Sequence, residues 1–253
     1  MIFVAIDENG YGPALGPLVV TGIVGSSDMD DGWPEEIIDS KKLFSSQRKL
    51  EILEKIALAL FNLSFHKMPT DAFDLFERSP DVICPQTQIC WDNFPKIPLC
   101  VSLSEIKKYS AYLSDFLGKH GLAIQSICSQ SVCARQFNNL CRNNLKKDYI
   151  NYLQFEKIIL TYHKMFKNIT VTAGKIGGRK NYAGFVKKNL SDWRIITKQE
   201  TADVSEYLLR KNDAEIALKF VRDIETKSFL GVLAGIYGKY IRQLCMTGIN
   251  RFF

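Results

Sequence analysis

The sequence predicts an α/β protein in which a mixed central sheet is flanked by helices. Short runs rich in β-forming residues are interspersed with longer stretches whose apolar residues recur every three or four positions. These two kinds of segment mix along the whole chain, which is typical of helices that cover the faces of a sheet. The 253 residues are 46% hydrophobic, which is enough to bury a substantial core.

Two strands, a helix and an irregular segment are expected in the first hundred residues. Residues 2–6 and 18–24 are apolar β-formers, and glycines and prolines fill the connection between them. Leucines and isoleucines at helical spacing then predict a helix capped by Ser45 or Ser46. Residues 66–102 contain five prolines and three cysteines. We expect them to form an irregular insertion, because they are too apolar for a solvated linker.

Helices and strands alternate in the rest of the chain. The expected helices cover residues 103–117, 134–166 with a break near Lys147, and 230–246. The expected strands cover residues 122–126, 169–172, 193–197, 206–209 and 216–224. A basic glycine-rich loop, Ala-Gly-Lys-Ile-Gly-Gly-Arg-Lys-Asn-Tyr, follows the strand at 169–172 and suits a phosphate group.

Charge and cysteine content narrow the class of protein. The net charge of +6 suits a polyanionic partner without identifying one. The seven cysteines form no C-x-x-C pair, which favours reduced thiols in a cytoplasm. The first apolar run is too short for a signal peptide, and no run approaches the ~20 apolar residues of a membrane span. We therefore expect a cytoplasmic protein that makes no membrane contact.

Two adjacent acids, Asp7 and Glu8, stand where the first apolar strand meets a glycine-rich turn. Neighbouring side chains of a strand point to opposite faces, so we expect the chain to leave the regular pleat there if both acids serve one site. Two carboxylates at a strand end suit Mg²⁺, which takes hard oxygen ligands and substrate phosphate oxygens. On these residues alone, a solvated turn is the simpler interpretation.

Two separated segments resemble type 2 ribonuclease H, also called ribonuclease HII. The first contains Asp-Glu-Asn-Gly-Tyr-Gly-Pro from residue 7, a Gly-Pro pair at 16–17 and Asp-Ser-Lys-Lys-Leu from residue 39. The second begins with Glu-Thr-Lys-Ser at residue 225 and ends with Lys-Tyr-Ile-Arg at 239–242. The resemblance implies a single RNase H-like domain over residues 1–253.

The same resemblance implies an activity and a set of site residues. The activity is the hydrolysis, by a metal-dependent endonuclease, of the RNA strand of RNA/DNA hybrids with Mg²⁺ or Mn²⁺. The residues that match the family's acids are Asp7, Glu8 and Glu225, which are expected to be both catalytic and metal-binding. A two-metal site stabilises the attacking and leaving oxygens of a phosphodiester.

The resemblance fails at the family's third carboxylate. That residue is an Asp before a Gly at the end of a strand, whereas residues 173–175 here are Ala-Gly-Lys. One acid fewer and one lysine more weaken a metal site. Asp223, expected on the same strand face as Glu225, is one replacement, and an inward-folded Glu200 or Asp203 is another. None of the three has support from a motif.

Substrate contacts are expected from the glycine-rich turn and from basic residues. Glycines let backbone amides approach a sugar-phosphate chain, and lysines before a helix or within a glycine-rich loop suit phosphates. Solvated surface lysines and a packing role for the tyrosine are the alternatives. The candidate substrate-binding residues are Asn9, Gly10, Tyr11, Gly12, Ser40, Lys41, Lys42, Lys175, Arg179 and Lys227.

Three functions therefore remain open. The first is a divergent ribonuclease HII-like nuclease. The second is a catalytically inactive nucleic-acid-binding module of the same fold, which Lys175 in the place of a metal ion would favour. The third is a partner-interaction protein whose docking surface is the insertion at 66–102. The sequence does not predict the oligomeric state.

Overall fold

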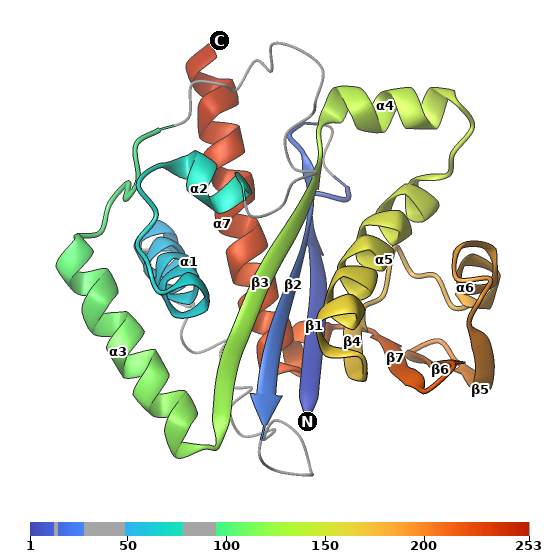
Figure 1. Cartoon of the computed structure of the whole chain (residues 1–253). Coiled ribbons are helices and arrows are strands. Elements are labelled where there is room, and N and C mark those ends of the chain that lie inside the picture. The colour runs from blue at the N-terminus through green and yellow to red at the C-terminus, as the bar shows by residue number, and fades with distance from the viewer. Residues whose placement is uncertain (13–14, 28–48, 78–94, 253) are drawn as a thin grey trace.

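A computed structural model describes residues 1–12, 15–27, 49–77 and 95–252 (Figure 1). The strands of this part of the chain are β1 (Ile2–Asn9), β2 (Leu18–Ser27), β3 (Leu122–Val132), β4 (Ile169–Gly174), β5 (Arg194–Glu200), β6 (Val204–Lys211) and β7 (Ala214–Val221). The helices are α1 (Lys49–Phe65), α2 (Ala72–Glu77), α3 (Leu103–Lys119), α4 (Ala134–Arg142), α5 (Lys147–Phe166), α6 (Ala183–Asn189), the 3₁₀ helix η3 (Ile224–Thr226) and α7 (Phe229–Phe252).

The described strands form one mixed sheet in the order β3-β2-β1-β4-β7-β6-β5. The first three strands are antiparallel neighbours, β1, β4 and β7 are parallel, and β7, β6 and β5 are again antiparallel. The carboxyl ends of the three parallel strands therefore meet at one edge of the sheet. Ile6 pairs with Ala173, and Gly174 pairs with Val221, so Asp7 lies level with the last residue of β4.

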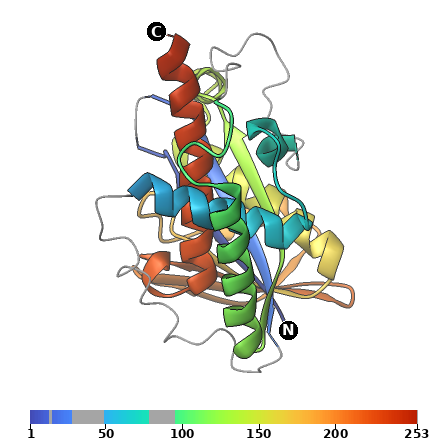
Figure 2. The same ribbon diagram turned by 90° about the vertical axis from the view of Figure 1, so that its left-hand side faces the viewer.

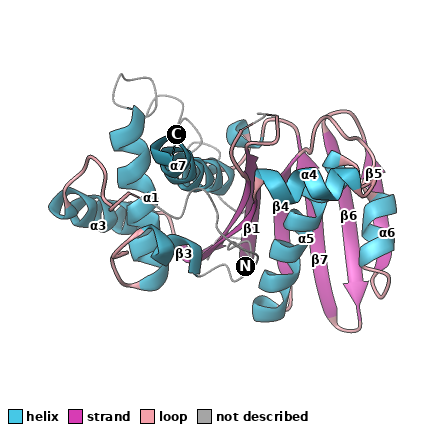
Figure 3. Cartoon of the chain, turned by 90° about the horizontal axis from the view of Figure 1, so that it is seen from above, coloured by secondary structure: helices cyan, strands magenta, loops and turns pink. Residues whose placement is uncertain are grey.

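Helices cover both faces of this sheet, as expected (Figures 1 and 3). Helices α1, α3 and α7 pack on one face around the first core, and α5 packs on the other around the second. Figure 2 shows the first of these layers from its outer side. Alternation along β1 assigns its residues to the two cores, since Ala5 joins the first and its neighbours Val4 and Ile6 join the second. The predicted α/β architecture is confirmed.

Helix α7 lies close along β1 because it carries small residues on the facing side. A Cβ atom at Gly235 would stand 2.7 Å from Oδ2 of Asp7, and one at Gly238 would stand 2.8 Å from Nδ2 of Asn9. The Asn9 side-chain amide donates a hydrogen bond to the Gly235 carbonyl oxygen at 3.2 Å. The carboxyl-terminal segment is thereby held beside the amino-terminal acids.

Several elements differ from the sequence-based expectation. The first strand does not leave the pleat at the acids, because β1 stays paired with β2 as far as Asn9. Strand β3 is eleven residues long, since it pairs along the whole of β2. The strand expected at 216–224 ends at Val221. The expected break near Lys147 is confirmed, and Ser45 and Ser46 lie outside the described residues.

The described parts of the segment at 66–102 are tied to the first core. The buried carboxylate of Glu54 accepts hydrogen bonds from the backbone amides of Leu99, Cys100 and Val101 at 2.6 to 3.1 Å. Its Oε1 also accepts a bond from the Tyr240 hydroxyl at 2.7 Å. Residues 78–94 lie outside the described part, so the single domain and its insertion remain predictions.

Two further expectations concern membranes and cysteines. None of the described helices is long and apolar enough to cross a membrane. None of the five cysteines in the described segments forms a disulfide.

Candidate functional site

The carboxylates of Asp7 and Glu8 approach each other at the end of β4. Asp7 faces α7, where it lies against Gly235. Glu8 lies on the other side of the sheet, where its charge acts on Tyr182 of the second core. Between them β4 ends at Gly174, whose Cβ, if it had one, would stand 3.1 Å from Asp7 Oδ1 and 3.7 Å from Glu8 Oε2. The missing side chain lets two acids from opposite faces meet without breaking the strand.

Burial makes the ionised form of both acids costly. Burial raises the pKa of Asp7 from 3.8 to about 7. A hydrogen bond from the Glu8 backbone opposes this shift, and the charge of Glu225 adds to it. Burial also raises the pKa of Glu8 from 4.5 to about 8, and the charge of Asp7 adds to this. No cationic side chain in the described residues pairs with either acid. The pair therefore calls for a proton or a bound cation.

Glu225 comes to this pair from the far end of the chain. It lies in η3, between the end of β7 and the start of α7, and its side chain is exposed. It is close enough to raise the pKa of Asp7. Asp223 does not share a strand face with it, since β7 has ended and Asp223 adopts a left-handed conformation with φ 54°. The expected replacement of the third acid by Asp223 on a strand is therefore wrong.

The donor set suits a hard divalent cation. Among the described residues, no three His, Cys, Asp or Glu side chains are grouped as a complete metal site. Mg²⁺ is commonly held by one or two carboxylates, with water and substrate phosphate oxygens completing its shell. Asp7 and Glu8 match that pattern, and Glu225 adds negative charge beside them. Gly174, which lies against both acids, offers no side-chain ligand.

Lys175 does not stand between the acids. Its ammonium donates to the Thr201 carbonyl oxygen at 2.7 Å and to the Ser205 hydroxyl at 3.1 Å, both on the β5–β6 side. The idea that a lysine occupies the place of a metal ion is therefore wrong. Glu200 does fold inward, but its carboxylate accepts hydrogen bonds from the backbone amides of Tyr182 and Ala183 and from the Tyr207 hydroxyl. Asp203 stays exposed, where it pairs with Arg222 at 3.4 Å.

The turn after β1 is shaped by two glycines and by an arginine of α7. Gly10 and Gly16 have φ values of 89° and 83°, which favour glycine. Arg242 lies beneath both, and its Nη2 donates to the Leu15 carbonyl oxygen at 2.8 Å. Its Nε is buried without a hydrogen-bond partner among the described residues. Arg242 thus ties the turn to the carboxyl-terminal helix.

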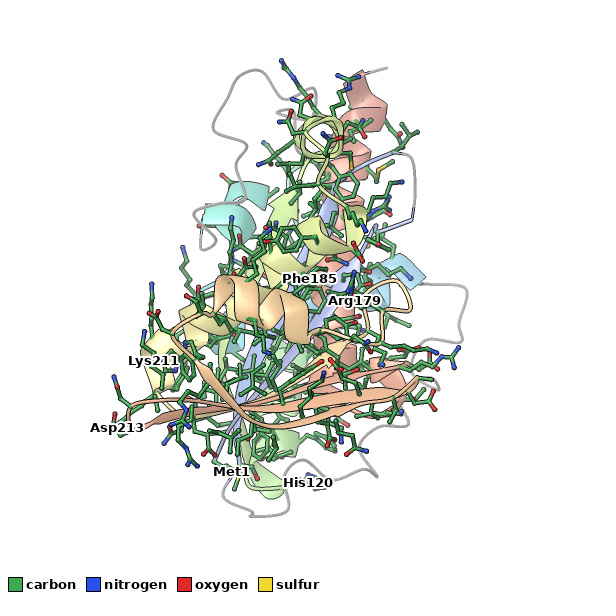
Figure 4. The ribbon with its side chains drawn as sticks, turned by 90° about the vertical axis from the view of Figure 1, so that its right-hand side faces the viewer. Met1, His120, Arg179, Phe185, Lys211 and Asp213 are labelled. Carbon is green, nitrogen blue, oxygen red and sulfur yellow. The ribbon has the colours of Figure 1, made fainter. Side chains whose placement is uncertain are left out.

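Tyr11 and Arg179 connect this turn with the basic glycine-rich loop. The ring of Tyr11 lies 2.9 Å from the place a Cβ of Gly177 would occupy, so the tyrosine packs on that loop. Arg179 donates to Asp148 at 2.9 Å through Nε, and its guanidinium lies 4.0 Å from the ring centre of Phe185 (Figure 4). Its cation is therefore already paired within the protein.

Of the remaining predicted substrate-binding residues, one turns toward α7, two are exposed and three lie outside the described part of the chain. Asn9 turns toward α7 and bonds to its backbone. Gly12 and Lys227 are exposed. Ser40, Lys41 and Lys42 lie outside the described residues.

The sequence did not predict two kinds of site residue: glycines that matter because they lack a side chain, and an arginine that matters because of its packing. Gly174 and Gly235 leave the space in which the acids lie, and Arg242 holds the turn. Gly235 and Arg242 fall within the carboxyl-terminal segment that resembles ribonuclease HII, which was a usable signal. Gly174 ends the strand that lacks the family's third acid, and no other sequence signal pointed to it.

The comparisons with known proteins give a distant structural likeness. No protein-family model matches the chain, and no curated protein matches it. Among solved structures, the chain is similar to one of the PCNA:RNase HII complex from Archaeoglobus fulgidus, with 16% identity and a TM-score of 0.47. The match covers 99% of this chain and 76% of the other.

Proposed function

We propose that this protein is a divergent ribonuclease HII-like endonuclease that hydrolyses the RNA strand of RNA/DNA hybrids with Mg²⁺ or Mn²⁺. One observation carries the proposal: Asp7 and Glu8 present half-buried carboxylates to one point at the end of β4, without a cationic partner among the described residues. The two motif segments that resemble ribonuclease HII contain these acids and Glu225, and Glu225 lies near Asp7.

Each part of the chain has a defined task in this proposal. Asp7 and Glu8 would hold the cation, which supplies an activated water and neutralises charge on the phosphate when bound. Glu225 lies beside Asp7 and adds a third negative charge on the exposed side of the site. The turn held by Arg242 presents its backbone at the same end of β1, where a sugar-phosphate chain would pass.

Cleavage of a labelled RNA/DNA hybrid in Mn²⁺ tests the proposal. The Asp7→Asn variant keeps the shape of the side chain and should lose cleavage by at least about a hundredfold, as expected when a two-metal ligand is removed. Asp115→Asn is the matched control, because Asp115 is an exposed acid on α3 that pairs with Lys119 at 2.9 Å. Equal cleavage by the wild type and Asp7→Asn would show that the Asp7 carboxylate takes no part in the reaction.

A second function is favoured by the glycine at position 174. A site with two converging carboxylates holds cations less firmly than one with three, and cleavage requires the cations. The second function is therefore that of a protein of this fold that binds nucleic acid without cleaving it. This function predicts salt-dependent binding of a hybrid duplex and no cleavage in Mn²⁺ by either the wild type or Asp7→Asn.

A further inference from the structure

A basic pocket adjoins the carboxylates on the side of β7. Its volume is about 360 Å³, and it lies among the end of β7, the loop after β4 and the turn between β5 and β6. Its lining residues are Lys175, Gly178, Lys180, Ala202, Arg222 and Asp223. Three cations, two from the loop after β4 and one from the end of β7, therefore line one small space.

The positive charge of this pocket is only partly compensated. The Lys175 ammonium is held by two neutral oxygens, those of Thr201 and Ser205. Lys180 is exposed and forms no ion pair with a described residue. Arg222 has a long, exposed contact with Asp203 at 3.4 Å. Exposed pairs of this kind are weak, so an anion can compete for the guanidinium.

One further acid faces the pocket, because Asp223 is part of its lining. Three cations thus face one acid in the lining and one that is paired at its rim. Burial lowers the pKa of Lys175, and repulsion from Lys180 and Arg222 also lowers it, while the charges of Asp203 and Glu200 act in the opposite direction. A bound anion would relieve this repulsion.

The loop that forms one wall is fixed in place before any ligand binds. The Lys175 amide donates to the Val221 carbonyl oxygen at 2.9 Å, and the Ile176 amide donates to the Tyr182 hydroxyl at 2.8 Å. Gly178 has a φ of 74°, and no atom lies within 4 Å of the place its Cβ would occupy. The wall is therefore held in place by hydrogen bonds at Lys175 and Ile176 and is open beside Gly178.

A second pocket adjoins the first across Gly178 and Lys180, which line both. It has a volume of about 320 Å³, and its other lining residues are Asp148, Gly177, Arg179 and Asn181. The two pockets form a track longer than one phosphate group. A chain of phosphates fits this arrangement better than a single small anion.

We propose that the pocket formed by Lys175, Lys180 and Arg222 binds a backbone phosphate of the nucleic-acid strand that passes the carboxylates. The assignment rests on the proposed function for the identity of the ligand. Lys175 of the pocket directly follows Gly174, which lies against both acids, so the pocket lies near the acidic site. It would hold the strand at a second point and so fix its register on the acids.

Two variants and a control test this pocket by hybrid binding. Lys180→Ala and Arg222→Ala are each expected to weaken binding of an RNA/DNA hybrid about three- to tenfold at moderate salt, and to reduce the slope of log K against log salt by about 1. Lys107→Ala removes an exposed lysine from α3, on the other face of the sheet, and should change neither. Binding is measured in EDTA, where no cleavage occurs.

A second measurement uses inorganic phosphate with the full chain. Its addition should shift the amide NMR signal of Gly178, and the shift should be lost in Lys180→Ala. If both pocket variants bind the hybrid like Lys107→Ala, or if phosphate moves the Gly178 signal but no hybrid binds, the assignment is overturned. If the variants weaken hybrid binding and the wild type does not cleave in Mn²⁺, the pocket stands and the nuclease function fails.

Discussion

Replacing Asp7 by Asn should stabilise the metal-free protein at high pH. The folded-state pKa of Asp7 is raised from 3.8 to about 7, so between these values the native state binds more protons than the unfolded state. Stability is therefore present at low pH and is lost as the pH rises through this range. A neutral amide removes the cost of a buried charge. The sign of the effect is opposite to that of a carboxylate in an ordinary salt bridge.

The size of the effect follows from the shift in pKa. A change from 3.8 to about 7 corresponds to about 4 kcal/mol at pH 8, and to less than about 2 kcal/mol at pH 5. The side chain keeps some exposure, so hydration reduces the cost. We expect Asp7→Asn to raise the free energy of unfolding by about 2 kcal/mol at pH 8, with a smaller gain at pH 5.

Urea denaturation in EDTA at both pH values measures this difference. Asp115→Asn should change stability by less than about 0.5 kcal/mol at either pH, because its ion pair with Lys119 is exposed. Saturating Mn²⁺ should stabilise the wild type at pH 8 and have little effect on Asp7→Asn. A loss of stability in metal-free Asp7→Asn at pH 8, or a gain independent of pH, would refute the idea that Asp7 is a buried, uncompensated acid.

Three further changes test the metal site, the packing of α7 on Asp7 and the buried carboxylate of the first core. Gly174→Asp places a Cβ atom 3.1 Å from Asp7 Oδ1 and adds a carboxylate beside the two acids, so it should tighten Mn²⁺ binding on the order of tenfold by calorimetry. Gly174→Asn crowds the acids equally without adding a charge and should not tighten it. Unchanged affinity in Gly174→Asp would contradict the geometry. Gly235→Ala places a methyl group 2.7 Å from Asp7 and should cost about 1 to 3 kcal/mol in urea denaturation, while Gly184→Ala, which meets no atom within 4 Å, should be neutral or stabilising. Glu54→Gln should cost about 2 to 4 kcal/mol, because the carboxylate accepts bonds from three successive amides and a hydroxyl, and a smaller loss would show that these bonds are dispensable.

The sequence predicted the features that depend on local pattern. Strand runs, the break near Lys147 and the mixed sheet follow from periodicity, which neighbouring residues determine. The direction of Lys175 was not predictable, because it depends on Thr201 and Ser205, which come from another strand pair. Helix α6 was missed because its seven residues are too few to show a period.

The site itself was predicted in part. Asp7 and Glu8 were expected to meet because the strand would break, and they approach across the end of a neighbouring strand instead. That arrangement depends on Gly174, which is more than 160 positions away in the sequence. A residue that acts by lacking a side chain leaves little trace in a pattern of residue types. The role of Gly174 becomes visible only when β4 is paired with β1.

Anomalous diffraction from crystals of the full chain soaked in Mn²⁺ would show whether Asp7 and Glu8 share a cation. We expect a peak at the end of β4, within about 2.3 Å of a carboxylate oxygen from both Asp7 and Glu8, with Glu225 joining directly or through water. Crystals of Asp7→Asn should lose the peak. A cation bound elsewhere, or none at these acids at pH 8, would show that Asp7 and Glu8 do not form a cation site.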